Sequence, residues 1–154
     1  MSETIFEYIT KFKNPIMWKS IVIHHSLTAD GLEVSWNAIR EYHKSLGWND
    51  IGYHAGIEMA EDRIEYQTGR ALDMQGAHTL GMNDKAIGIC VVGNFDILPP
   101  TPRHYFLLAC LCRAFQNRFG ILIQDINFHR DYANKSCPGR KFDKMVLRDL
   151  IAGI

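Results

Sequence analysis

The run IGICVVGNF, from Ile87 to Phe95, is the segment that most restricts the fold of this chain. Its apolar residues occupy both sets of alternating positions. Successive side chains of a strand point to opposite faces of the sheet, so both faces of this strand must be buried. We therefore expect a central strand here, in a sheet that is flanked by other elements.

Three further segments predict strands around it. The run SIVIHHS, from Ser20 to Ser26, ends abruptly in two histidines, which indicates a buried strand that delivers His24 and His25 at its C-terminal end. The segments YHAGIEM and RIEYQ on either side of AEDR predict a hairpin. The segment ILIQDINFHR predicts a last strand that leads up to His129.

Helices alternate with these strands along the chain. Ser35 caps a predicted amphipathic helix that runs to about Leu46. Thr101, followed by proline, starts the longest predicted helix, which ends at Gly120, and the segment KFDKMVLRDLIAGI closes the chain with a short helix. The pattern predicts an α/β fold: a single domain over residues 1–154, with its core at about 20–150 and a central mixed β-sheet flanked by α-helices. The N-terminal segment is expected to pack on the outside.

The charge balance limits the partners. Seventeen basic residues match seventeen acidic ones, so there is no overall field that attracts nucleic acid or an anionic membrane. The first twenty residues, MSETIFEYITKFKNPIMWKS, mix charged with apolar residues and contain neither a signal core nor a transmembrane span. We expect a protein that is made in the cytoplasm, does not bind nucleic acid or insert into membranes, and needs no state beyond a monomer.

The loop HRDYANKSCPG, from His129 to Gly139, places a thiol among residues typical of turns. A catalytic zinc takes about three protein ligands and one open position, and histidine nitrogen with cysteine thiolate is a suitable set. His129, Cys137 and one histidine of the Ser20–Ser26 strand would provide it. Each alone is more often an ordinary polar residue, but together they favour a metal site. Five residues are expected to be structural: Cys90, Cys110 and Cys112 as core thiols without disulfides, and His43 and His104 as ordinary histidines on helices.

Neighbouring residues of a strand face opposite ways, so only one of His24 and His25 can be the ligand, and composition does not choose between them. A resemblance to a known protein family does distinguish between these two histidines. The segments IVIHHS, GWNDIGYH, QTGRALDMQGAHTLGMNDKAIGICVVGNFD and HRDYANKSCPG, which span about residues 20–150, resemble the zinc-dependent N-acetylmuramoyl-L-alanine amidases of the type 2 family. This family includes phage amidase-type lysozymes and animal peptidoglycan recognition proteins. The resemblance implies one Zn²⁺ at the floor of a shallow groove, with His24, His129 and Cys137 as ligands and His25 in a supporting role.

The resemblance also implies roles for residues around the metal. Tyr53 and Lys135 match positions that assist catalysis in the phage enzymes. The zinc would activate water to attack the amide between muramic acid and L-alanine, while Lys135 and Tyr53 stabilise the charge on the carbonyl oxygen. His78 and Asn83 are expected near the substrate; the alternative is that they only hold their loop through hydrogen bonds to the backbone. Arg70 is expected to be a structural anchor.

Three functions remain open on the sequence. The first is a peptidoglycan amidase of a phage or prophage, an endolysin that reaches the cell wall through a membrane pore. The second is a cytosolic amidase that recycles muropeptides, a subfamily that resembles this chain less because it typically has Asp where Cys137 stands. The third is a peptidoglycan-binding module without catalysis. In the animal family members, a cysteine at this position accompanies amidase activity, so Cys137 favours an enzyme.

Overall fold

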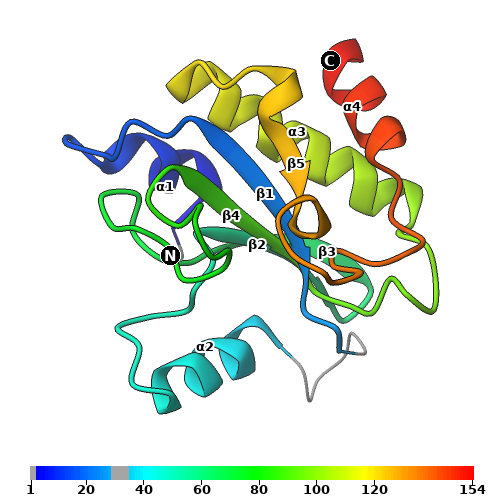
Figure 1. Ribbon diagram of the computed structural model, residues 1–154, viewed down its shortest axis with the longest axis horizontal. Coiled ribbons are helices and arrows are strands. Elements are labelled where there is room, and N and C mark those ends of the chain that lie inside the picture. Colours follow the sequence, from blue (N-terminus) through cyan, green and yellow to red (C-terminus); the bar gives the residue numbers. More distant parts are fainter. Residues whose placement is uncertain (1–2, 29–34) are drawn as a thin grey trace.

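The computed structural model describes residues 3–28 and 35–154, and its centre is a five-stranded mixed sheet with the order β3-β2-β4-β1-β5 (Figure 1). The strands are β1 (Ser20–His25), β2 (Ala55–Ala60), β3 (Arg63–Thr68), β4 (Ala86–Val91) and β5 (Ile126–Phe128). Strand β1 pairs in parallel with β4 and β5, β2 pairs in parallel with β4, and β2 and β3 form the antiparallel hairpin. The predicted central strand and the predicted fold class are confirmed.

Helices cover both faces of this sheet (Figure 1). The helices are α1 (Ile5–Lys11), α2 (Trp36–Ser45), α3 (Pro102–Phe119) and α4 (Lys144–Gly153). The odd-numbered residues of β1 and β4, such as Ile23 and Ile89, pack into the main core with α1, α3 and α4. Cys90 faces the other way and packs with Trp36 at the start of α2. Within the described residues, no helix has both the length and the apolar character needed to cross a membrane.

The helix boundaries follow the predicted caps. The Ser35 side chain accepts a hydrogen bond from the Ala38 N–H at the start of α2. Thr101 caps α3 in the same way, and Gly120 ends it in the left-handed region with φ of +71°. A side-chain oxygen at the N-cap satisfies a backbone N–H that has no partner inside the helix, which is why these residue types mark helix starts.

Two strands are shorter than predicted. Strand β4 ends at Val91, because Gly93 has φ of +146°, a conformation that leaves the strand, and the chain continues to Phe95 as a loop. Strand β5 covers only Ile126–Phe128, and a 3₁₀ turn that begins at His129 follows it. His129, the predicted zinc ligand, therefore lies on a turn just after strand β5.

The N-terminal segment is part of the core, so the prediction that it packs on the outside was wrong. Thr4 and Glu7 form a reciprocal cap that starts α1. Tyr8 and Ile9 are then buried in the main core, and Tyr8 donates a hydrogen bond to the carbonyl of Arg70. This contact ties α1 to the long loop between β3 and β4.

Candidate active site

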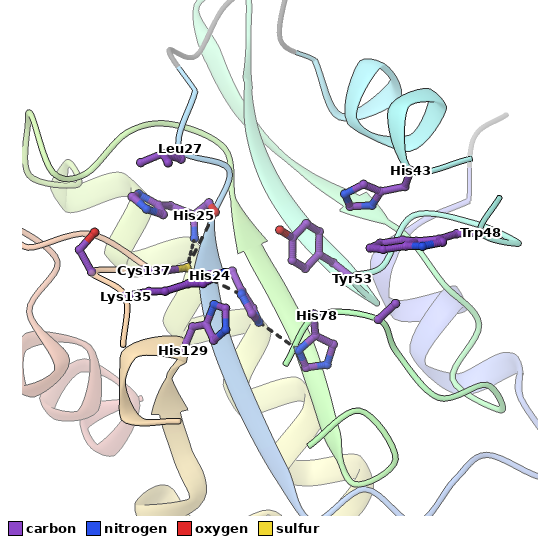
Figure 2. A pocket seen from close by; sticks show the side chains of 12 residues that line it. His24, His25, Leu27, His43, Trp48, Tyr53, His78, His129, Lys135 and Cys137 are labelled. Carbon is purple, nitrogen blue, oxygen red and sulfur yellow. Dashed lines mark hydrogen bonds between the residues drawn. The ribbon is translucent and has the colours of Figure 1, made fainter. Parts of the chain in front are cut away.

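A cavity of about 570 Å³ opens beside the C-terminal ends of β1 and β4, on the α2 side of the sheet (Figure 2). Strand β1, helix α2, the segments next to β2 and β4, and the loop after β5 all contribute to its walls. The residues that line it are His24, His25, Leu27, His43, Trp48, Tyr53, Ala77, His78, His129, Lys135, Ser136 and Cys137.

The three predicted zinc ligands lie together in this cavity. One ligand atom from each of His24, His129 and Cys137 lies within 4.8 Å of the other two. The Nδ1 atom of His24 is 3.7 Å from the Sγ atom of Cys137, and the ring centroids of His24 and His129 are 4.6 Å apart. Two imidazole nitrogens and a thiolate fit Zn²⁺, and a fourth position would stay open for water or substrate.

Hydrogen bonds around His78 determine which nitrogen of His24 is free. The Nε2 atom of His78 lies 3.0 Å from the Ala86 carbonyl oxygen, which can only accept, so this nitrogen carries the hydrogen. The Nδ1 atom of His78 then faces the Nε2 atom of His24 at 3.0 Å as an acceptor. His24 therefore donates from Nε2, beside the Thr79 hydroxyl, and its Nδ1 lone pair points toward Cys137.

His25 faces the opposite side of the sheet from His24. Its Nδ1 atom accepts a hydrogen bond from the Phe95 N–H at 3.2 Å, and its ring stacks on that of Phe95. Its backbone N–H donates to the Cys137 Sγ atom at 3.4 Å. His24 therefore belongs to the cluster with His129 and Cys137, and His25 contacts Cys137 through its backbone.

Burial controls the protonation of the three predicted ligands. It holds the pKa of His24 well below the usual value and also lowers that of His129, so both imidazoles are neutral at pH 7. Burial raises the pKa of the Cys137 thiol to about 11, although the His25 N–H and the Lys135 ammonium act in the other direction. A metal that binds here must therefore displace the thiol proton.

Tyr53 and Lys135 both line the cavity, one from each wall (Figure 2). The ring centroid of Tyr53, two residues before β2, is 5.1 Å from that of His24. Burial raises the pKa of Tyr53 well above its usual value, so its hydroxyl stays protonated and available as a hydrogen-bond donor. Lys135 is exposed and lies on the loop between His129 and Cys137.

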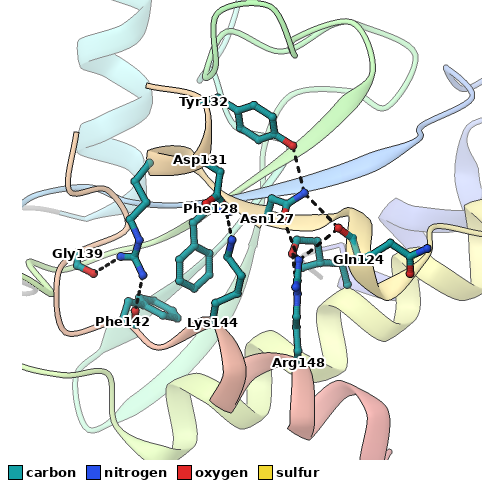
Figure 3. Close-up of polar contacts among 11 residues, drawn as sticks. Gln124, Asn127, Phe128, Asp131, Tyr132, Gly139, Phe142, Lys144 and Arg148 are labelled. Atoms are coloured by element: carbon teal, nitrogen blue, oxygen red, sulfur yellow. Dashed lines mark hydrogen bonds and ion pairs between the residues drawn. The ribbon is translucent and has the colours of Figure 1, made fainter. Parts of the chain in front are cut away.

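The loop that carries His129 and Cys137 is held by hydrogen bonds from Arg130, and Figure 3 shows the Gly139 and Phe142 carbonyls that accept two of them. The Arg130 guanidinium donates to the carbonyls of Gly139 at 2.8 Å and Phe142 at 3.1 Å. The backbone N–H of Arg130 donates to the Cys137 carbonyl at 2.8 Å. Below it, Asp131 accepts from the Phe128 N–H at 2.8 Å and pairs with Lys144 of α4. The loop is thereby attached to both β5 and α4.

The predicted substrate residues differ in their positions. His78 lines the cavity, whereas Asn83 is absent from the described lining. The Asn83 Oδ1 atom accepts from the backbone N–H groups of His78 at 2.8 Å and Thr79 at 2.9 Å, which is the loop-holding alternative. The Arg70 guanidinium donates to three carbonyls, as expected of an anchor: those of Asp50, Ile51 and Gln75.

Sequence reasoning missed two residues around the site. His43 was interpreted as a helix-surface residue, but it lines the cavity, accepts from the Gly52 N–H at 2.9 Å and packs on Trp48. It follows Ile39 by one helical turn on the inner face of α2, a spacing that identifies the buried side. Thr79 left no signal, since its contact with His24 joins residues that are 55 positions apart.

Two other interpretations also need correction. His104 is buried rather than on the surface. Its ring accepts a hydrogen bond from the Thr101 N–H and so takes part in the N-terminal cap of α3. Cys90 and Cys112 are core thiols as predicted, but Cys110 is only partly buried.

Comparison with known proteins agrees with this geometry. The family model described as N-acetylmuramoyl-L-alanine amidase matches residues 13–140. The endolysin of Escherichia phage T7 is 36% identical over 133 residues, which cover 83% of this chain and 85% of the phage protein. The structure of the endolysin amidase LysCS from Clostridium intestinale has a TM-score of 0.75 at 28% identity and covers 98% of this chain and 89% of its own.

A second solved structure comes from animals. A variant of Drosophila PGRP-LB in complex with tracheal cytotoxin has a TM-score of 0.68 at 26% identity, over 85% of this chain and 79% of its own. The phage T7 protein thus shares a sequence pattern with this chain, and the Clostridium and Drosophila proteins share its fold. The match over most of its length shows that the chain belongs to the type 2 N-acetylmuramoyl-L-alanine amidase family, which includes the peptidoglycan recognition proteins.

Proposed function

We propose that this protein is a zinc-dependent amidase that hydrolyses the bond between N-acetylmuramic acid and L-alanine in peptidoglycan. The observation that carries the proposal is the cluster of His24, His129 and Cys137 in a cavity that Tyr53 and Lys135 also line. The similarity to the phage T7 endolysin supports the role of a phage or prophage endolysin. Such a protein is made in the cytoplasm and acts on the wall after release through a membrane pore.

One Zn²⁺ would be held by His24 through Nδ1, by His129 and by the Cys137 thiolate. When bound, zinc supplies Lewis acidity, which polarises a carbonyl and lowers the pKa of water towards neutrality. The protein keeps both histidines neutral by burial and keeps His24 oriented through His78, so the ligands are arranged before the metal arrives.

Tyr53 and Lys135 would act on the amide carbonyl. As the carbonyl carbon is attacked, its oxygen gains negative charge, and groups that already face it stabilise that charge best. The Tyr53 hydroxyl remains a donor because burial raises its pKa. The Lys135 ammonium adds a positive charge from the loop beside Cys137.

The substrate would lie along α2. A smaller cavity of about 270 Å³ adjoins the site and shares His43 and Tyr53 with it. Its other lining residues are Ser26, Thr28, Ala38, Ile39 and Tyr42. The mixture of hydroxyl and aromatic groups suits a sugar or a short peptide, and the tracheal cytotoxin complex of PGRP-LB supports a peptidoglycan-derived ligand.

The test is digestion of purified peptidoglycan with and without a chelator. New L-alanine amino termini should appear without new reducing sugar ends, and the chelator should stop their release until zinc is restored. Release of reducing ends alone would refute the amidase. Binding without any cleavage would instead assign the chain to the non-catalytic modules.

The Cys137→Ser variant is the matched control for the metal. It changes one ligand atom in a side chain of similar size, so we expect the fold to persist while zinc binding and activity are lost. Zinc content by atomic absorption and the far-ultraviolet circular dichroism spectrum report these two properties separately. Full activity in this variant would show that the ligand set is wrong.

A further inference from the structure

The turn that carries Cys137 is held by one carboxylate from the loop after β4. The Oδ2 atom of Asp96 accepts a hydrogen bond from the Ser136 hydroxyl at 2.9 Å, and its Oδ1 atom accepts from the Arg140 N–H at 2.8 Å. Ser136 precedes Cys137 and Arg140 follows it by three residues. One side chain thus spans the turn and fixes the chain on both sides of the thiol.

The backbone next to Asp96 packs directly on the same turn. The Lys141 N–H donates to the Phe95 carbonyl at 2.9 Å. Gly139 has φ of +122°, and a Cβ atom at this position would lie 2.5 Å from the Phe95 carbonyl carbon. Since only glycine allows so close an approach, the turn has no freedom to move toward the loop.

The loop is in turn attached to the strand that carries His24. The Phe95 N–H donates to the His25 ring, and the His25 N–H donates to the Cys137 Sγ atom. Together with Asp96, these contacts close a circuit from β1 through the loop after β4 to the Cys137 turn and back to β1. This set of contacts fixes the position of the Cys137 Sγ atom relative to the His24 Nδ1 atom, which lies 3.7 Å away.

The effect of Asp96 comes from hydrogen bonds rather than from an ion pair. The Arg140 guanidinium lies 3.7 Å from the Asp96 Oδ1 atom, but the Arg140 side chain is 77% exposed. Exposed pairs of this kind contribute little because water screens them. The Asp96 side chain is only 18% exposed, so its hydrogen bonds to the turn are better protected.

We infer that Asp96 is a positioning residue that presents the Cys137 thiolate to the metal by clamping Ser136 and the Arg140 N–H. The inference rests on the proposed zinc site. Groups that orient metal ligands typically change metal affinity by about 10–100-fold when removed. The family motif that ends in Cys-Pro-Gly thus needs a partner more than forty positions earlier in the chain.

The test compares zinc dissociation constants, measured by competition with a chromophoric chelator. We expect Asp96→Ala to weaken zinc binding by about 10–100-fold, as for other groups that orient ligands. Ser136→Ala removes one of the two contacts and should have a smaller effect in the same direction. Asp96→Asn should stay close to the wild type, since its amide can accept from the Arg140 N–H and donate to the Ser136 hydroxyl. The thiolate-to-metal charge-transfer band of the Co²⁺ form should weaken or shift in Asp96→Ala.

Asp143→Ala provides the control for general destabilisation. Asp143 caps α4 through the N–H groups of Met145 and Val146, so this variant loses stability at another place. Its zinc affinity should be that of the wild type, and a loss equal to that of Asp96→Ala would refute the inference. An Asp96→Asn variant that binds zinc as weakly as Asp96→Ala would also refute the inference, because the charge of Asp96 rather than its hydrogen bonds would then determine zinc affinity.

The outcomes separate this inference from the proposed function. A wild-type protein that binds no zinc refutes the proposed metal site itself. If the wild-type protein binds zinc, and the Asp96→Ala and Ser136→Ala variants have the zinc affinity and the Co²⁺ spectra of the wild type, only the role of Asp96 is refuted. If Asp96→Ala does not fold, Ser136→Ala and Asp96→Asn decide the question.

Discussion

The Nε2 atom of His24 and the Nδ1 atom of His78 face each other at 3.0 Å, in the one arrangement that leaves the Nδ1 lone pair of His24 free for a metal. We therefore expect His78→Ala to lower zinc affinity by about 10–100-fold, although His78 itself is no ligand. Chelator competition measures the change. Gly88→Ala should act in the same direction, because its Cβ atom would lie 2.5 Å from the His78 ring. Unchanged affinity in both variants would refute this role.

Tyr53→Phe should separate catalysis from metal binding. The variant keeps the ring that packs beside His24 and removes only the hydroxyl that would stabilise the carbonyl oxygen. Loss of one such donor typically lowers kcat by about 10²–10³-fold. We expect this decrease together with wild-type zinc content, measured on the same preparation. A variant that has lost its zinc would show that Tyr53 supports the ligands instead.

His54 should make folding stability depend on pH. It is fully buried, accepts from the Gly88 N–H and donates to the Met74 carbonyl, and burial lowers its pKa from 6.5 to about 4. Between pH 6.5 and about 4, the unfolded chain therefore binds a proton that the native protein does not, so stability falls as the pH falls. The shift corresponds to about 3 kcal/mol over this window.

Urea unfolding of wild type and His54→Gln at several pH values between 7 and 4 measures this contribution. Glutamine can both accept and donate at this position but does not titrate. The difference between the two stability curves isolates His54 from His24 and His78, whose pKa values burial also lowers. Parallel curves would show that His54 has the same pKa in the native and the unfolded protein, and would contradict this prediction.

Gly56→Ala should destabilise the protein by about 1–3 kcal/mol, as overpacking of a core does. A Cβ atom at Gly56 would lie 2.1 Å from the ring of Trp36, which is fully buried at the start of α2 and donates to the Thr68 carbonyl. Urea unfolding gives the change in free energy. Gly153→Ala is the matched control, since no atom lies within 4 Å of its added Cβ, and its stability should stay near that of the wild type.

Much of the fold could be predicted because the information is local. The apolar runs that became β1 and β4, and the caps at Ser35, Thr101 and Gly120, depend on residues only a few positions apart. The boundaries of elements with weaker sequence patterns were not predictable in this way. Strand β5 is three residues long, and its alternation is too short to distinguish it from the turns on both sides.

The candidate site was predictable where the family resemblance implies a role for a residue and not elsewhere. His24, His129 and Cys137 have such implied roles, and the structure brings them together. Thr79 and Asp96 lie in a segment that also resembles the family, but no role is implied for them there, and their contacts join residues 55 and 40 positions apart. No local pattern marks such a contact, because it depends on how the sheet brings distant loops together.

Among the residues that the structure describes, strand β1 pairs with β4 and β5, both of which come later in the chain. During synthesis, the strand that carries His24 therefore waits for residues 86–91 before it has a neighbour, and the Cys137 thiol follows His24 by 113 positions. Non-local parallel pairing of this kind slows folding. A ribosome-bound fragment that stops at residue 124 has only His24 of the three clustered side chains, so uptake of zinc at the proposed site would report that synthesis has passed Cys137 and that the sheet has formed.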